Sequence, residues 1–122
     1  MRALVLIVLT LCAVAAPQRA LAVDPPYQQE MERLAEILGS LYFLDPLCKP
    51  SGDDWRNELA ELVSLDQPDV DRQQRLYGAF NTGFTAYSRL YRSCTASADE
   101  ALTRLLMEAE TTARDIHSRF AE

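Results

Sequence analysis

The sequence has few of the residues from which catalytic and metal sites are built. It contains one histidine, His117, and four glycines that are isolated from one another. A hydrolase pairs its nucleophile with an aligned base, and a zinc site needs several Cys or His ligands. The sequence also lacks a Gly-rich phosphate loop and the paired Glu-x-x-His pattern of di-iron bundles. We therefore predict a protein that is not an enzyme and holds no metal. An enzyme with an unrecognised carboxylate site is the class that this reasoning leaves open.

Positive charge is also scarce. The chain has 12 Lys and Arg residues against 18 Asp and Glu residues, for a net charge of −6. Arg2 and Arg19 precede Ala22 and every acidic residue follows it, so the chain from Val23 onward carries −8. A small domain with this charge repels phosphate backbones. Nucleic-acid binding is therefore not expected.

The first 22 residues have the pattern of a secretory signal peptide. Arg2 provides a positive start, and an almost unbroken apolar run follows over residues 3–16. Ala20 and Ala22 place small side chains where a signal peptidase checks them. We predict cleavage after Ala22, a domain over residues 23–122, and a periplasmic or secreted location.

The leader segment has two other interpretations, a membrane anchor and a lipoprotein signal. A membrane anchor needs about 20 apolar residues, more than this run provides, so no stable membrane insertion is expected after cleavage. A lipoprotein would be acylated at Cys12, but Leu11 occupies a position that requires a small residue. Export without lipidation is the favoured prediction.

Four stretches of the remaining chain have helical periodicity, and none alternates as a strand. They cover about residues 26–44, 54–64, 69–94 and 97–120. The short loops between them favour antiparallel neighbours. The prediction is an all-α, up-down-up-down bundle of four helices with a short second helix. Apolar positions cover about half of the third helix, which suggests that this helix is central.

Local signals predict where these helices begin and end. Asp24 suits a cap for the first helix, and Pro46 is expected to end it. Cys94 is expected to close the third helix. Ser97 and Glu100 form a capping box that would start the fourth.

The two cysteines outside the leader are expected to form a disulfide. Cys48 and Cys94 follow the ends of the first and third helices, which run in the same direction in this topology. Both therefore lie at one end of the bundle, and an exported chain is expected to pair them. A redox-active pair is the alternative, but such cysteines are normally close in sequence.

Two segments of the chain resemble an uncharacterised family of small secreted alphaproteobacterial helical proteins. They are residues 41–48, LYFLDPLC, and residues 90–94, LYRSC; residues 77–81, YGAFN, also fit. The resemblance implies a disulfide and a location in the cell envelope. It implies no activity.

A cofactor site in the bundle interior is an alternative function. Met31 near the start of the first helix and His117 near the end of the fourth would lie at the same end. Such a pair could bind haem axially. The other interpretation is that Met31 fills the core, and no cofactor is the favoured prediction.

The leading functional hypothesis is a non-enzymatic protein that binds another, unknown envelope protein. Tyr42, Phe43, Tyr91 and Arg92 lie near the predicted disulfide and form the candidate partner surface. Aromatic and Arg side chains dominate the energetics of protein interfaces. The alternative is that the aromatic rings pack the bundle.

Overall fold

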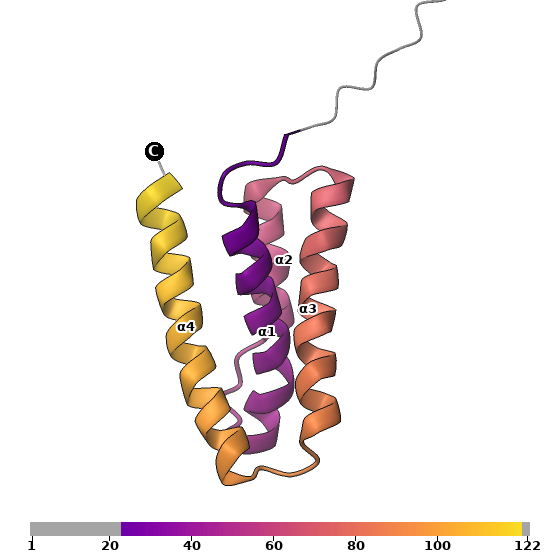
Figure 1. Ribbon diagram of the computed structural model, residues 1–122, viewed down its shortest axis with the longest axis vertical. Helices are drawn as coiled ribbons and strands as arrows, with labels where there is room; N and C mark the ends of the chain where they lie inside the picture. Colours follow the sequence, from indigo (N-terminus) through magenta and orange to yellow (C-terminus); the bar gives the residue numbers. More distant parts are fainter. Residues whose placement is uncertain (1–22, 121–122) are drawn as a thin grey trace, which may run out of the picture.

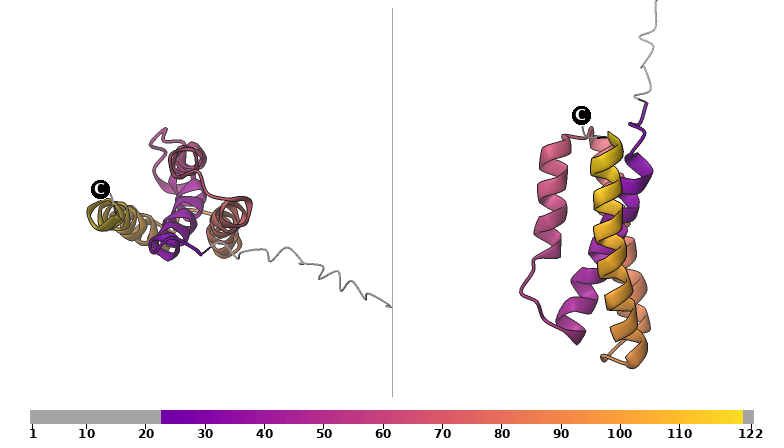
Figure 2. Two further views of the ribbon diagram at one scale, coloured as in Figure 1. Left: turned by 90° about the horizontal axis from the view of Figure 1, so that it is seen from above. Right: turned by 90° about the vertical axis from the view of Figure 1, so that its left-hand side faces the viewer.

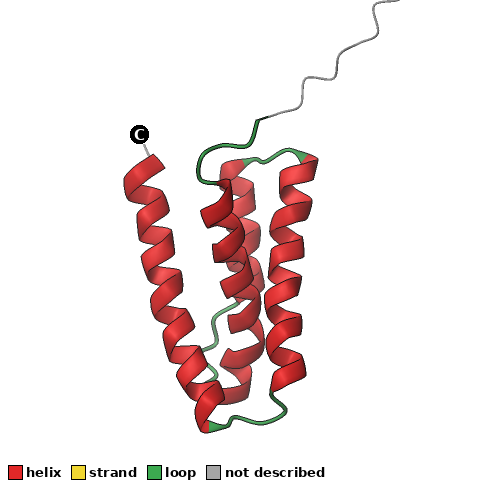
Figure 3. Ribbon diagram, viewed as in Figure 1, coloured by secondary structure: helices red, strands yellow, loops and turns green. Residues whose placement is uncertain are grey.

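The computed structural model describes residues 23–120, which form four α-helices and no strands (Figures 1 and 3). The predicted leader and its cleavage site lie outside these residues. The helices are α1 (Gln28–Cys48), α2 (Trp55–Asp66), α3 (Val70–Leu90) and α4 (Ala96–Phe120). They run in alternating directions, which confirms the predicted up-down-up-down bundle with a short second helix.

The central helix is α1, and the prediction that the third helix is central was wrong. The other three helices each pack on α1 and have few contacts with one another. Viewed from above, α2, α3 and α4 stand around α1 on different sides (Figure 2). The physical reason is that apolar residues surround much of α1. Those with less than one-tenth of their surface exposed are Met31, Leu34, Ala35, Ile37, Leu38, Leu41 and Leu44.

Two glycines let α1 and α3 approach closely. A Cβ built on Gly39 would lie 1.8 Å from the carbonyl oxygen of Phe80, and one built on Gly83 would lie 2.0 Å from that of Glu36. Since real Cβ atoms do not come this close, any side chain at these positions would push the helices apart. The two glycines therefore set the spacing of the α1–α3 pair.

The start of α1 and its end both differ from the prediction. Asp24 does not cap α1, because its carboxylate binds the guanidinium of Arg75 at 2.6 and 2.8 Å. Pro46 does not end the helix, which continues to Cys48. A proline removes only one backbone hydrogen bond in the last turn, and the N–H of Lys49 still bonds to the Asp45 carbonyl at 2.9 Å.

The end of α3 and the start of α4 also differ. Tyr91 adopts an extended backbone that ends α3 before Cys94, so Cys94 lies in the connecting loop. The cap of α4 is Thr95, whose hydroxyl oxygen accepts the N–H of Ala98 at 3.1 Å. Ser97 lies within the helix and does not form the predicted capping box.

The predicted disulfide is present. The sulfur atoms of Cys48 and Cys94 are 2.03 Å apart, and the two Cα atoms are 5.0 Å apart. The bridge joins the end of α1 to the loop after α3. The bridge therefore holds together the C-terminal ends of α1 and α3, the two helices that Gly39 and Gly83 allow to approach closely.

Candidate binding groove

The four residues of the predicted partner surface have different immediate neighbours in the structure. Tyr42 is 37% exposed. Its ring lies 5.6 and 5.7 Å from those of Phe80 and Phe84, and the guanidinium of Arg56 lies 5.6 Å from it. Phe43 meets Phe84 edge-on at 5.8 Å. Tyr42 and Phe43 therefore belong to the seam between α1 and α3.

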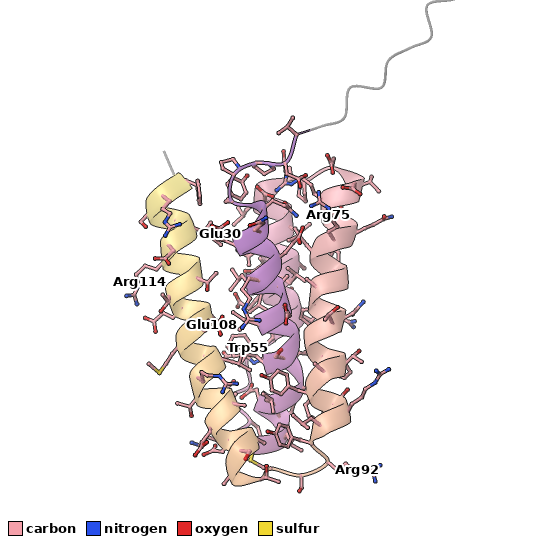
Figure 4. The ribbon with its side chains drawn as sticks, viewed as in Figure 1. Glu30, Trp55, Arg75, Arg92, Glu108 and Arg114 are labelled. Carbon is pink, nitrogen blue, oxygen red and sulfur yellow. A yellow bond between two sulfur atoms is a disulfide. The ribbon has the colours of Figure 1, made fainter. Side chains whose placement is uncertain are left out.

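Tyr91, like Phe43, packs against the hydrophobic cluster that α1 and α4 form around Leu41 and Leu102. Tyr91 stacks on Tyr87 at 6.4 Å, and the hydroxyl of Tyr87 accepts a hydrogen bond from Arg104 at 3.4 Å. Arg92 is exposed and projects away from the helices (Figure 4). Within residues 23–120, no aromatic contact joins Tyr42 or Phe43 to Tyr91.

The disulfide does not form a metal site. Cys48, Cys94 and Asp99 are the one group of potential ligands that lie together among the described residues. Both sulfur atoms are bonded to each other, so neither is a thiolate ligand. Asp99 faces the ammonium of Lys49 at 3.4 Å.

A groove lies between α2 and α4, above the side chains of α1. Three hollows of about 450, 310 and 370 Å³ follow one another along it. The upper and middle hollows share Leu62 and Ala113, and the middle and lower hollows share Trp55 and Leu106. The groove exists because α2 and α4 both pack on α1 and make few contacts with each other.

The groove has an apolar floor in its upper and middle hollows, and its walls combine polar side chains with exposed apolar ones. The floor on α1 consists there of the buried side chains of Met31, Leu34 and Leu38. On its walls, Leu65 is 84% exposed and Met107 is 66% exposed. Contiguous apolar surface of this kind marks interaction sites in small proteins.

The sequence pattern does not identify most of these wall residues. It predicts a loop at Leu65 and an inward-facing Leu106 on the fourth helix, and it does not single out Met107. Leu106 is 41% exposed because only Leu105 of the run 105–107 turns fully to the core. Three consecutive apolar residues in a helix cannot all face one neighbour, since they spread over about 200°. The run of residues 105–107 therefore indicates from sequence alone that at least one of its apolar side chains lies outside the core.

The lower part of the groove is organised around a buried carboxylate. Asp45 is 6% exposed and accepts hydrogen bonds from the Ser51 hydroxyl at 2.6 Å and the Ser51 N–H at 3.2 Å. It also accepts the indole N–H of Trp55 at 3.0 Å. These bonds fix the loop 49–54 and hold Trp55 in the groove wall. The side chain of Trp55 is visible beside α1 in Figure 4.

The upper part of α2 is fixed by a polar network. The hydroxyl of Tyr27 donates to Asp66 at 2.5 Å, and Arg72 donates to Asp66 at 2.5 Å and to Gln28 at 2.7 Å. The hydrogen bond to Asp66 raises the pKa of the Tyr27 phenol above its ordinary value of 10.0. The network ties the end of α2 to the starts of α1 and α3.

On the other side of the groove, ion pairs fasten α4 to α1. The guanidinium of Arg33 donates to both carboxylate oxygens of Glu108 at 2.8 and 2.9 Å, next to α1 in Figure 4. Such bidentate pairs fix geometry as well as adding energy. Both walls are therefore held at a defined distance from the floor.

The groove carries an excess of negative charge. Its lining includes five carboxylates and one lysine: Asp45, Asp53, Glu58, Asp66, Glu110 and Lys49. Ion pairs within the chain occupy Asp66, Glu110 and Lys49. Asp53 and Glu58 form no ion pair with any described residue, and Asp45 accepts only from neutral donors.

Met31 and His117 both line the upper hollow, so they do lie at the same end, as expected. Met31 is 5% exposed and belongs to the hydrophobic core, whereas His117 is exposed. Met31 therefore fills the core, which is the other interpretation that the sequence offered. The hollow beside it is lined by both Met31 and His117.

Comparison with protein families matches residues 26–120 to the family described as "Protein of unknown function (DUF2385)". Comparison with curated proteins and with solved structures found no match. Within residues 23–120, no helix has both the length and the apolar character needed to cross a membrane.

Proposed function

The chain belongs to the uncharacterised DUF2385 family, and we propose that it is a non-enzymatic protein-interaction module of the cell envelope. The single observation that carries this proposal is the apolar groove between α2 and α4, with walls fixed by Asp45 on one side and Arg33–Glu108 on the other. A rigid apolar groove can bind a partner with little ordering of its own side chains.

The envelope location comes from the leader. The pattern of residues 1–22 supports export with cleavage after Ala22, and the resemblance supports an alphaproteobacterial envelope. Cell fractionation with N-terminal sequencing tests this part. The expected result is an envelope protein that begins at Val23. A cytoplasmic protein, or one acylated at Cys12, would contradict it.

Site-specific photo-crosslinking in the native cell tests the groove. A photoreactive residue replaces Met107 in the groove or, as a matched control, Leu90 on α3; both side chains are 66% exposed. We expect one discrete protein adduct from position 107 and none from position 90. No adduct at 107, or the same adduct from both positions, would contradict the proposal.

A carrier of an apolar ligand or haem is the second candidate. The observation that favours it is the shared upper hollow of about 450 Å³ that Met31 and His117 line. Haem titration of the purified protein should then give a sharp Soret band that His117→Ala abolishes. A spectrum that is identical for the two proteins would remove this candidate.

A further inference from the structure

The α2–α4 groove is long enough to accommodate one short helix. Its wall on α4 extends from Thr103 to Phe120, about 26 Å at 1.5 Å per residue. A partner helix of about 17 residues would fill that length. A helix in the groove would contact the chain on three sides: the floor on α1 and the walls on α2 and α4.

From these dimensions and the charge of the groove, we propose that its occupant is an amphipathic helix of another protein, with an apolar stripe bordered by Lys or Arg. This inference rests on the proposed function and specifies the partner. The apolar stripe would contact Leu62, Leu65, Leu106 and Met107, which line the groove. Recognition of this kind reads apolar anchors at helical spacing.

The negative charge of the groove favours a partner helix whose polar side chains are positively charged. Asp53 and Glu58 lie along the α2 side and form no ion pair with residues 23–120. Asp45 beneath them adds a third negative charge that only neutral donors solvate. Basic side chains at the edge of a docked helix would meet these carboxylates, whereas acidic ones would be repelled.

The same charges disfavour a second copy of this chain. A two-fold dimer that buried the groove would place the carboxylates of Asp53 and Glu58 of both copies in one interface. The chain from Val23 onward also carries a net charge of −8. Both observations favour a basic partner over self-association.

Synthetic peptides test the proposal on the exported protein. The probe is an 18-residue peptide with leucines at helical spacing and lysines elsewhere. One control replaces each lysine by glutamate, and another scrambles the order so that no apolar stripe remains. Trp55 lies in the groove wall and is the only tryptophan, so its fluorescence reports binding directly.

We expect the lysine peptide to bind at least about tenfold more tightly than either control. Met107→Ser should weaken this binding by about tenfold, and Leu90→Ser should leave it unchanged. Glu58→Gln should weaken it less than Met107→Ser and lower its salt dependence. Thermal unfolding of each variant shows that the fold is retained.

Four outcomes would overturn the inference. The first is that the scrambled peptide binds as tightly as the lysine peptide, and the second is that Met107→Ser and Leu90→Ser weaken peptide binding equally. The third is that the protein forms a dimer that Met107→Ser abolishes. The fourth is that the protein binds phosphatidylcholine vesicles saturably and does not bind the peptide. The proposed function fails separately, if photo-crosslinking at position 107 captures no protein. A captured partner that lacks a basic amphipathic helix would reject this inference alone.

Discussion

The indole N–H of Trp55 donates to the Asp45 carboxylate at 3.0 Å, across the loop that joins α1 to α2. The same carboxylate accepts the Ser51 hydroxyl at 2.6 Å. A single buried acid therefore determines how the α1–α2 loop folds and where the only tryptophan lies in the groove.

Asp45→Ala should lower the free energy of unfolding by about 2–4 kcal/mol, because it leaves the donors of Ser51 and Trp55 without their buried acceptor. Urea unfolding followed by Trp55 fluorescence measures this. Asp53→Ala is the control, since its exposed carboxylate has no ion pair among the described residues, and should change stability by less than about 0.5 kcal/mol. Equal effects would show that Asp45 does not organise the loop.

Gly39→Ala and Gly83→Ala should each destabilise the fold by about 2 kcal/mol or more, because the new Cβ would meet the backbone of the facing helix. Gly78→Ala is the matched control on α3. A Cβ there has nothing within 4 Å, so alanine should raise stability by about 0.5–1 kcal/mol through helix propensity. In thermal and in chemical unfolding, the midpoint should therefore fall for Gly39→Ala and Gly83→Ala and rise for Gly78→Ala. A stabilising Gly39→Ala would contradict the close α1–α3 contact.

Replacing both Cys48 and Cys94 with serine should lower stability by about 2–4 kcal/mol. The bridge closes a loop with a sequence separation of 46, for which chain entropy alone gives about 4 kcal/mol. Unfolding with and without a reductant provides the measurement, and the reduced wild type should match the double variant. If the reductant changes nothing, the bridge does not contribute to stability.

Tyr27 should titrate later than a free tyrosine. The hydrogen bond to Asp66 raises its pKa in the folded protein above 10.0, so its contribution to stability is complete below pH 10 and is lost as the pH rises through the folded pKa. Ultraviolet absorbance resolves the phenolate signal of the five tyrosines. Tyr27→Phe should remove the last-titrating component. If that component remains, Tyr27 does not carry the raised pKa.

Tyr42→Ala and Arg92→Ala test the partner surface predicted from the sequence. Tyr42 packs between Phe80, Phe84 and Arg56, so its loss should cost about 1–3 kcal/mol of stability. Arg92 is exposed, and its loss should leave the melting transition unchanged. Weaker capture of an envelope partner by a stable Arg92→Ala variant would support that surface. Unchanged capture would show that Arg92 does not contribute to partner binding.

The bundle and its disulfide could be predicted because helical periodicity and loop length act locally. The central position of α1 could not be predicted, although its sequence contains an indication of it. Ala35, Ile37 and Gly39 are also buried, and they lie beside the apolar stripe that includes Leu34, Leu38 and Leu41. Periodicity shows which apolar residues share one face of a helix, but it does not give the number of helices that pack against it. That number depends on close backbone approach, which Gly39 and Gly83 permit only as a pair.

The groove could not be predicted for a related reason. A pattern that assigns apolar residues to the core assumes that every apolar face has a neighbour within the chain. Met107 and Leu65 break this assumption because no fifth helix is present among the described residues to cover them. The negative charge of the whole chain was evident, but its gathering around the groove depends on how the loop 49–54 folds.

The central position of α1 imposes an order on synthesis. Among the helices that the structure describes, the one on which the other three pack is made first, and its partners on α3 and α4 follow tens of residues later. At about 5–20 residues per second, α1 waits on the order of several seconds with its apolar circumference uncovered. Throughout that interval α1 is an uncovered apolar segment of the nascent chain to which a chaperone would bind.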